Sequence, residues 1–105
     1  MKRGTTPTLQ IQHDMDITTV KTVEFLFKQH KLECANVLLK KTYPNDVTEK
    51  DGVFYIPFTE LETRLFSANR MFYCDPKVTF TDGKIPATEI LELHCSPTLW
   101  GEDND

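Results

Sequence analysis

Cysteine and histidine give this chain its greatest scope for chemistry, because both can ligate metals and take part in nucleophilic catalysis. His30 and Cys34 are four positions apart, and His94 directly precedes Cys95. A four-residue spacing aims two side chains at one ion on a helix, but the residues around this pair lack helical periodicity. Neighbouring strand residues such as His94 and Cys95 point to opposite faces of a sheet. The sequence therefore predicts no metal site.

The cysteines also bear on redox chemistry. The chain has three of them, Cys34, Cys74 and Cys95, and no Cys-x-x-Cys pair. An odd number without close pairs argues against a disulfide-stapled secreted domain. Cys74 and Cys95 fall in neighbouring predicted strands but several residues out of register, so we expect no disulfide between them. A Cys-His nucleophile also needs an orienting Asn or Asp and an oxyanion donor, and a cysteine hydrolase stays open as an alternative.

The chain has sixteen acidic residues, but no pair is marked out for acid–base catalysis. Glu24, Glu89 and Glu92 are expected on solvated strand faces. Glu60 and Glu62 favour the first turn of a helix, where carboxylates complement the dipole. The sequence contains no GxGxxG, P-loop, HExxH or GxSxG motif. We therefore predict no catalytic residue, no cofactor and no enzymatic activity.

Length, net charge and apolar runs limit the classes of partner that we expect. A chain of 105 residues with 39% apolar residues is the size of a single domain. The net charge is −4, and the longest basic run is Lys40-Lys41, so nucleic acid is not an expected partner. No apolar run reaches the length of a membrane span, and residues 1–8 lack the apolar region of a signal peptide. We expect synthesis in the cytoplasm, no membrane partner and no secretion by a signal peptide.

The elements that must position these residues are strands. Phe72 to Leu93 predicts a β-hairpin folded about Asp82-Gly83, because apolar residues alternate with polar ones on the first arm and Asp-Gly suits a tight turn. In this hairpin Cys74 lies opposite a position near residue 91. Pro76 lacks an N–H and indicates a bulge or an unpaired edge.

Further strands follow from the same alternation. They are predicted at residues 9–12, 20–29, 37–42, about 47–48, 53–58, 70–81 and 85–95. Thr59 to Phe66 predicts a short helix, since Thr59 and Glu62 have capping-box spacing and Leu61 lies four residues before Leu65.

These elements predict an immunoglobulin-like antiparallel β-sandwich of seven or eight strands, with one short connecting helix near residues 60–66. The expected core consists of the apolar side of each alternation: Leu9, Ile11, Val23, Phe25, Phe27, Leu39, Phe54, Ile56, Phe58, Leu61, Phe72, Val78 and Phe80.

The predicted domain covers residues 9–101, and the two ends of the chain are more polar than this domain. Residues 1–8 form a polar arm that Pro7 keeps extended, and residues 102–105 form an acidic, frayed tail. Trp100, beyond the last predicted strand, is either a lid over the core or an anchor for a neighbouring subunit. The residues expected to contact a partner are Thr5, Thr6, Pro7 and Trp100.

Three pieces of the sequence together resemble a family of small proteins encoded in prophages and tailed phages of Gram-positive bacteria. They are Met1–Leu9, Ile17–Gln29, and the segment from Thr81-Asp-Gly through Ala87–Ile90 to Leu99-Trp-Gly101. The family is similar to the N-terminal β-sandwich domain of phage baseplate proteins. The chain departs from it in a longer connection at residues 45–52, in Pro76 and in the acidic tail.

The resemblance implies a non-catalytic structural or assembly role in a phage tail or baseplate, and it carries over no catalytic or ligand-binding residue. The implied partners are other phage structural proteins or further copies of the chain, and the implied location is the virion or its tail. A carbohydrate- or host-binding adhesin is the main alternative, since β-sandwiches also serve that role.

Overall fold

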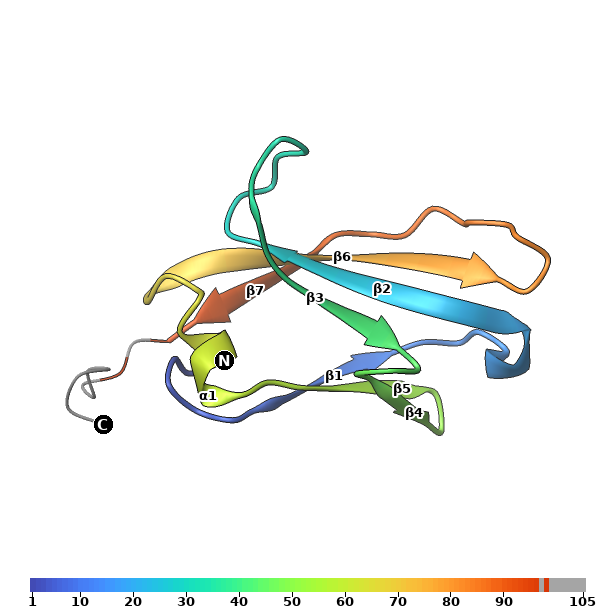
Figure 1. The fold of residues 1–105 in the computed structure, drawn as a ribbon, viewed down its shortest axis with the longest axis horizontal. Helices are drawn as coiled ribbons and strands as arrows, with labels where there is room; N and C mark the ends of the chain where they lie inside the picture. The colour runs from blue at the N-terminus through green and yellow to red at the C-terminus, as the bar shows by residue number, and fades with distance from the viewer. Residues whose placement is uncertain (97, 99–105) are drawn as a thin grey trace.

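The computed structural model describes residues 1–96 and 98, and it is an all-β structure of two antiparallel sheets (Figure 1). One sheet has the order β1-β5-β4 and the other β3-β2-β6-β7. The strands are β1 (Thr8–Gln12), β2 (Val20–Lys28), β3 (Val37–Tyr43), β4 (Thr48–Lys50), β5 (Val53–Pro57), β6 (Arg70–Phe80) and β7 (Leu91–Cys95). A 3-10 turn, η1 (Ile17–Thr19), precedes β2, and a single helical turn, α1 (Glu60–Thr63), follows β5.

The core lies between the two sheets, where the phenylalanines of β2 meet residues from the β5 side. Phe25 contacts Phe54 edge to face at a centroid distance of 5.5 Å, and Phe27 contacts Phe58 in the same way at 5.3 Å. Each of these rings lies on the buried side of its own alternation, as period-2 patterning requires. Eight predicted core residues are buried: Val23, Phe25, Phe27, Phe54, Ile56, Phe58, Phe72 and Val78. Four more pack partly buried against them: Leu9, Ile11, Leu39 and Phe80.

The prediction for Leu61 was wrong, since this side chain is 76% exposed. The helix begins at the predicted capping box but ends at Thr63, so Leu65 lies beyond it, and both leucines are exposed. Phe66 fills the core in their place, contacting Phe72 at 4.4 Å and Phe27 at 6.1 Å between centroids. Among the described residues no helix is long and apolar enough to span a bilayer.

The predicted hairpin register is confirmed, because Cys74 pairs with Leu91 and Arg70 with Cys95. The predicted start of the last strand at residue 85 was wrong. The ladder between β6 and β7 stops at Cys74, and residues 84–90 run as an exposed connection (Figure 1). Pro76 explains the break, since it has no N–H to donate and its carbonyl accepts a hydrogen bond from the Thr88 hydroxyl.

Candidate functional site

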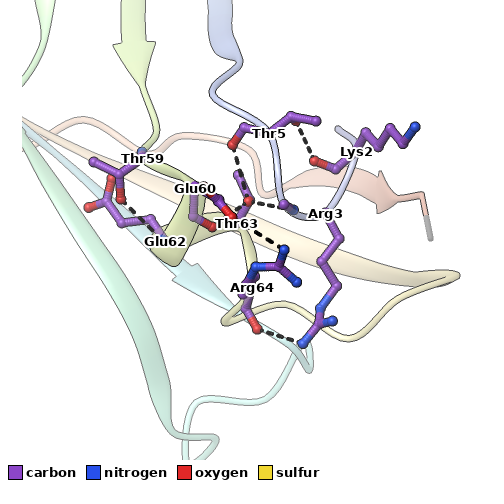
Figure 2. A network of polar contacts seen from close by, with 9 residues as sticks. Lys2, Arg3, Thr5, Thr59, Glu60, Glu62, Thr63 and Arg64 are labelled. Atoms are coloured by element: carbon purple, nitrogen blue, oxygen red, sulfur yellow. Dashed lines mark hydrogen bonds and ion pairs between the residues drawn. The ribbon is translucent and has the colours of Figure 1, made fainter. Parts of the chain in front are cut away.

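Residues 1–5, which belong to the predicted polar arm, are bonded to their own domain, and Figure 2 shows the contacts of Lys2, Arg3 and Thr5. The Met1 ammonium group donates to the His94 carbonyl at 3.0 Å, and Lys2 forms a parallel bridge with Ser96. The Arg3 guanidinium donates to the carbonyls of Phe66 and Arg64, both at 3.1 Å. The start of the chain thus closes one end of the sandwich against β7 and the segment after α1.

Thr63 is the centre of this closure. Its side chain is fully buried, and its hydroxyl accepts a hydrogen bond from Gly4 N–H at 2.9 Å. The same hydroxyl lies 2.8 Å from the Glu60 carbonyl and 3.2 Å from the Thr5 carbonyl. Gly4 has φ +78°, and a Cβ there would lie 3.0 Å from an Arg64 nitrogen, so this close approach favours glycine.

The predicted partner contacts therefore lie in different settings. Thr5 is half-buried in the network, Thr6 is exposed, and Pro7 is half-buried with its carbonyl accepting from Phe58 N–H. Trp100 lies outside the described residues. That Thr5, Thr6, Pro7 and Trp100 contact a partner stays a prediction.

The cysteines lie in two environments. Cys34 is exposed in the β2–β3 loop, whereas Cys74 and Cys95 are fully buried. Burial, with a smaller contribution from the neighbouring Asp75 carboxylate, raises the pKa of Cys74 to about 12. Burial also raises the pKa of Cys95, against the opposing charges of the N-terminus and Arg3. Both thiols therefore stay protonated at neutral pH and are poor nucleophiles.

His13 has a largely buried side chain, and the sequence patterns did not single it out. Its Nε2 lies 2.7 Å from the Glu49 carboxylate, and the two side chains are 7% and 11% exposed. Because Nδ1 accepts a hydrogen bond from Met15 N–H, Nε2 carries the proton and donates to Glu49. The ring also stacks on Phe54 at 4.5 Å. This pair fastens the end of β1 to β4. Among the described residues no group of three His, Cys, Asp or Glu side chains could hold a metal ion.

Lys41 and Glu62 join β3 to α1. Lys41 Nζ lies 2.9 Å from Glu62 Oε1, and the same oxygen accepts from Thr59 N–H at 2.8 Å to complete the predicted capping box. Partial burial would raise the pKa of Glu62, but the bonds from Lys41 and Thr59 outweigh it and lower that pKa. Glu62 is thus an anion that holds two elements together.

A cleft of about 400 Å³ opens on the outer face of the four-stranded sheet, and we call it the outer cleft. Leu26 of β2 and Tyr73 of β6 line it, together with Leu32 from the β2–β3 loop and Ile90 from the β6–β7 connection. Leu32 is 62% exposed and Ile90 39%. The β2–β3 loop projects away from the sheet in Figure 1, and Lys28 holds it by donating to the Leu32 and Glu33 carbonyls. Charged side chains line the same cleft, namely Lys28, Lys31, Glu33 and Asp75, so the outer cleft has a mixed apolar and charged lining.

A comparison with models of known protein families finds no match to this chain, and a comparison with curated proteins finds none either.

Proposed function

We propose that this protein is a non-catalytic structural or assembly module of a phage or prophage tail or baseplate, acting through protein–protein contacts. The observation that carries the proposal is the outer cleft, where Leu32 and Ile90 expose apolar side chains to solvent in the same cleft as Leu26 and Tyr73. Large apolar side chains gathered on one exposed face are typical of protein interaction sites. The partners would be other structural proteins of the particle or further copies of the chain.

We also propose that the strands are arranged as in an immunoglobulin-like β-sandwich. The order β1-β5-β4 matches strands B, E and D of an immunoglobulin-like sandwich, and β7-β6-β2-β3 matches G, F, C and C′. This agreement supports an immunoglobulin-like β-sandwich, in which loops and edges are the usual places for partner contacts.

The two alternatives receive less support. A cysteine hydrolase requires a reactive thiolate, and burial keeps the thiols of Cys74 and Cys95 protonated. This argument applies to two of the three cysteines, since Cys34 is exposed. A carbohydrate-binding adhesin is favoured by a ladder of exposed aromatic residues along one sheet. In the outer cleft Tyr73 is an isolated aromatic residue among aliphatic and charged side chains.

The proposal is tested by deleting the gene from the phage or prophage that encodes it and complementing with variants. We expect the deletion to stop particle assembly, the wild-type gene to restore it, and Leu32→Ser with Ile90→Ser to restore it poorly. Leu61→Ser with Leu65→Ser is the matched control, since it removes two exposed leucines from the region of α1. Complete, infectious particles formed without the gene would overturn the proposal, as would a genomic neighbourhood of metabolic genes instead of tail genes.

A further inference from the structure

The hydrogen bonds between β1 and β5 show which backbone groups of β1 point away from β5. Phe58 N–H donates to the Pro7 carbonyl at 3.0 Å, and His13 N–H donates to the Gly52 carbonyl at 2.9 Å. Hydrogen-bonded and non-bonded pairs alternate along an antiparallel ladder, and the register from Thr8↔Pro57 onward is unbroken. The odd-numbered residues of this segment therefore bond with β5, and the even-numbered residues turn their N–H and C=O groups away from it.

The groups on this free edge belong to Thr8, Gln10 and Gln12. All three side chains are exposed and uncharged, and β1 contains no proline, lysine or bulge. Proline, lysine and bulges are the features by which natural sheets block unwanted strand pairing, and β1 lacks them. The β1 edge is thus a template to which another strand can add.

The other edges of the two sheets carry such protection. β3 has Lys40 and the inward-pointing Lys41 and borders a register shift at Phe27/Lys28. β4 is three residues long and contains Glu49 and Lys50. On the β7 side, the unpaired part of β6 contains Asp75, Pro76 and Lys77, and β7 itself contains Glu92. Pairing β3 with itself brings Lys40 and Lys41 close together, pairing β4 about Glu49 sets that carboxylate against itself, and Pro76 of β6 lacks a donor, whereas pairing β1 about Gln10 does none of these.

We propose that the occupant of the β1 edge is β1 of a second copy of this chain, paired antiparallel about Gln10. This inference deepens the proposed function, on which it rests, by naming the contact. The edge is self-complementary: with Gln10 opposite Gln10 of the partner, Thr8 of each copy faces Gln12 of the other. Each such pair can exchange an N–H···O=C bond in both directions, and the two three-stranded sheets become one continuous sheet.

Side chains support the same register. Leu9 and Ile11 point to the inner face of the sheet and are half-buried in the single chain. In the pairing about Gln10, Leu9 of one copy lies directly opposite Ile11 of the other, at the close spacing of a non-hydrogen-bonded pair. Beside them lies a groove of about 500 Å³ that is lined also by Gln10 and Gln12 of β1 and by Leu91, Glu92 and Leu93 of β7. The new pair covers this groove with apolar atoms, which adds a hydrophobic contribution to the backbone bonds.

A charge exchange at residue 10 tests the inference, because the two-fold axis passes beside this residue and makes it face itself. We expect wild-type chain to form dimers in sedimentation equilibrium over a concentration series. Gln10→Lys alone and Gln10→Glu alone should each dimerise more weakly, since like charges directly opposite are unfavourable. An equal mixture of the two should recover, with a Kd about fivefold lower than that of either variant alone. Thr48→Lys and Thr48→Glu, on the exposed β4 edge of the same sheet, are the matched controls and should behave as wild type.

Gln10→Pro gives an independent test. Within the described part of the chain, the Gln10 N–H points away from β5, so the folded monomer should keep its thermal transition while the dimer weakens by roughly tenfold or more. A wild-type chain that stays monomeric up to about millimolar concentration would overturn this inference. So would dimers that are insensitive to every residue 10 variant. Neither result decides the proposed function, which fails separately if particles assemble without the gene.

Discussion

β1 and β3 are edge strands of different sheets. An edge strand presents backbone N–H and C=O groups with which another strand can pair, and the side chains of β1 and β3 differ in whether they discourage this pairing. β3 carries Lys40, which lies 3.4 Å from Glu24, and Lys41, which points inward to Glu62. β1 consists of Thr, Leu, Gln, Ile and Gln, with no charged residue. Inward-pointing charge is a recognised way to keep an edge from pairing. The difference teaches that of these two edges only β1 lacks charged side chains, and that β3 uses an edge residue, Lys41, to hold α1.

Substitution of His13 is expected to lower the free energy of unfolding more than the other substitutions. It tests whether the pair of His13 with Glu49 fastens β1 to β4. His13→Ala leaves the Glu49 carboxylate buried without its partner and removes the acceptor of Met15 N–H. We expect a loss of about 3 kcal/mol in the free energy of unfolding, measured by urea denaturation. His94→Ala, at an exposed position, is the control and should change stability by less than about 0.5 kcal/mol. Equal effects of the two substitutions would show that β1 is not fastened by this pair.

Thr63→Val examines the segment that leads into β1. The substitution keeps the shape of a fully buried side chain but leaves Gly4 N–H without its acceptor. An unsatisfied buried donor should lower the free energy of unfolding by about 2 kcal/mol. Thr6→Val, at an exposed position of the same segment, is the matched control. A thermal transition unchanged by Thr63→Val would mean that residues 1–5 contribute nothing to the fold.

Glu62→Gln tests the contact between Lys41 of the β3 edge and α1. We expect it to lower the free energy of unfolding by about 1 kcal/mol at pH 7, a smaller effect because the carboxylate is partly exposed. The pKa of Glu62 is lowered in the folded protein from its ordinary value of 4.5. Its contribution is therefore complete above 4.5 and is lost as pH falls through the lower folded pKa. The stability difference between wild type and Glu62→Gln should shrink below pH 4.5. A difference that stays constant down to pH 2 would contradict the charge-based account of the β3–α1 contact.

Local signals predicted a large part of the fold. Alternation located the strands, the Thr59 and Glu62 spacing located the start of α1, and Asp82-Gly83 set the register that brings Cys74 opposite Leu91. These features depend on residues near one another in sequence. The late start of β7 depends instead on Pro76, whose missing N–H interrupts a ladder that alternation alone would have continued.

The candidate sites were harder to predict because they depend on distant partners. His13 gives no local sign that it meets Glu49, and Arg3 gives none that its guanidinium reaches the carbonyls of Arg64 and Phe66. Phe66 belonged to the predicted helix, but Leu61 was expected in the core and Phe66 was not, because the early end of the helix at Thr63 gives no local sign. The free edge of β1 could be derived only once its pairing with β5 was known.

Hydrogen exchange along β1, followed by NMR as a function of protein concentration, tests the central claim most directly. In dilute protein the Leu9 and Ile11 amides should be protected by β5, while those of Thr8, Gln10 and Gln12 exchange rapidly. At high concentration the three even-numbered amides should become protected together. Even-numbered amides that stay unprotected at every concentration would contradict the account, as would amides already protected in the dilute monomer.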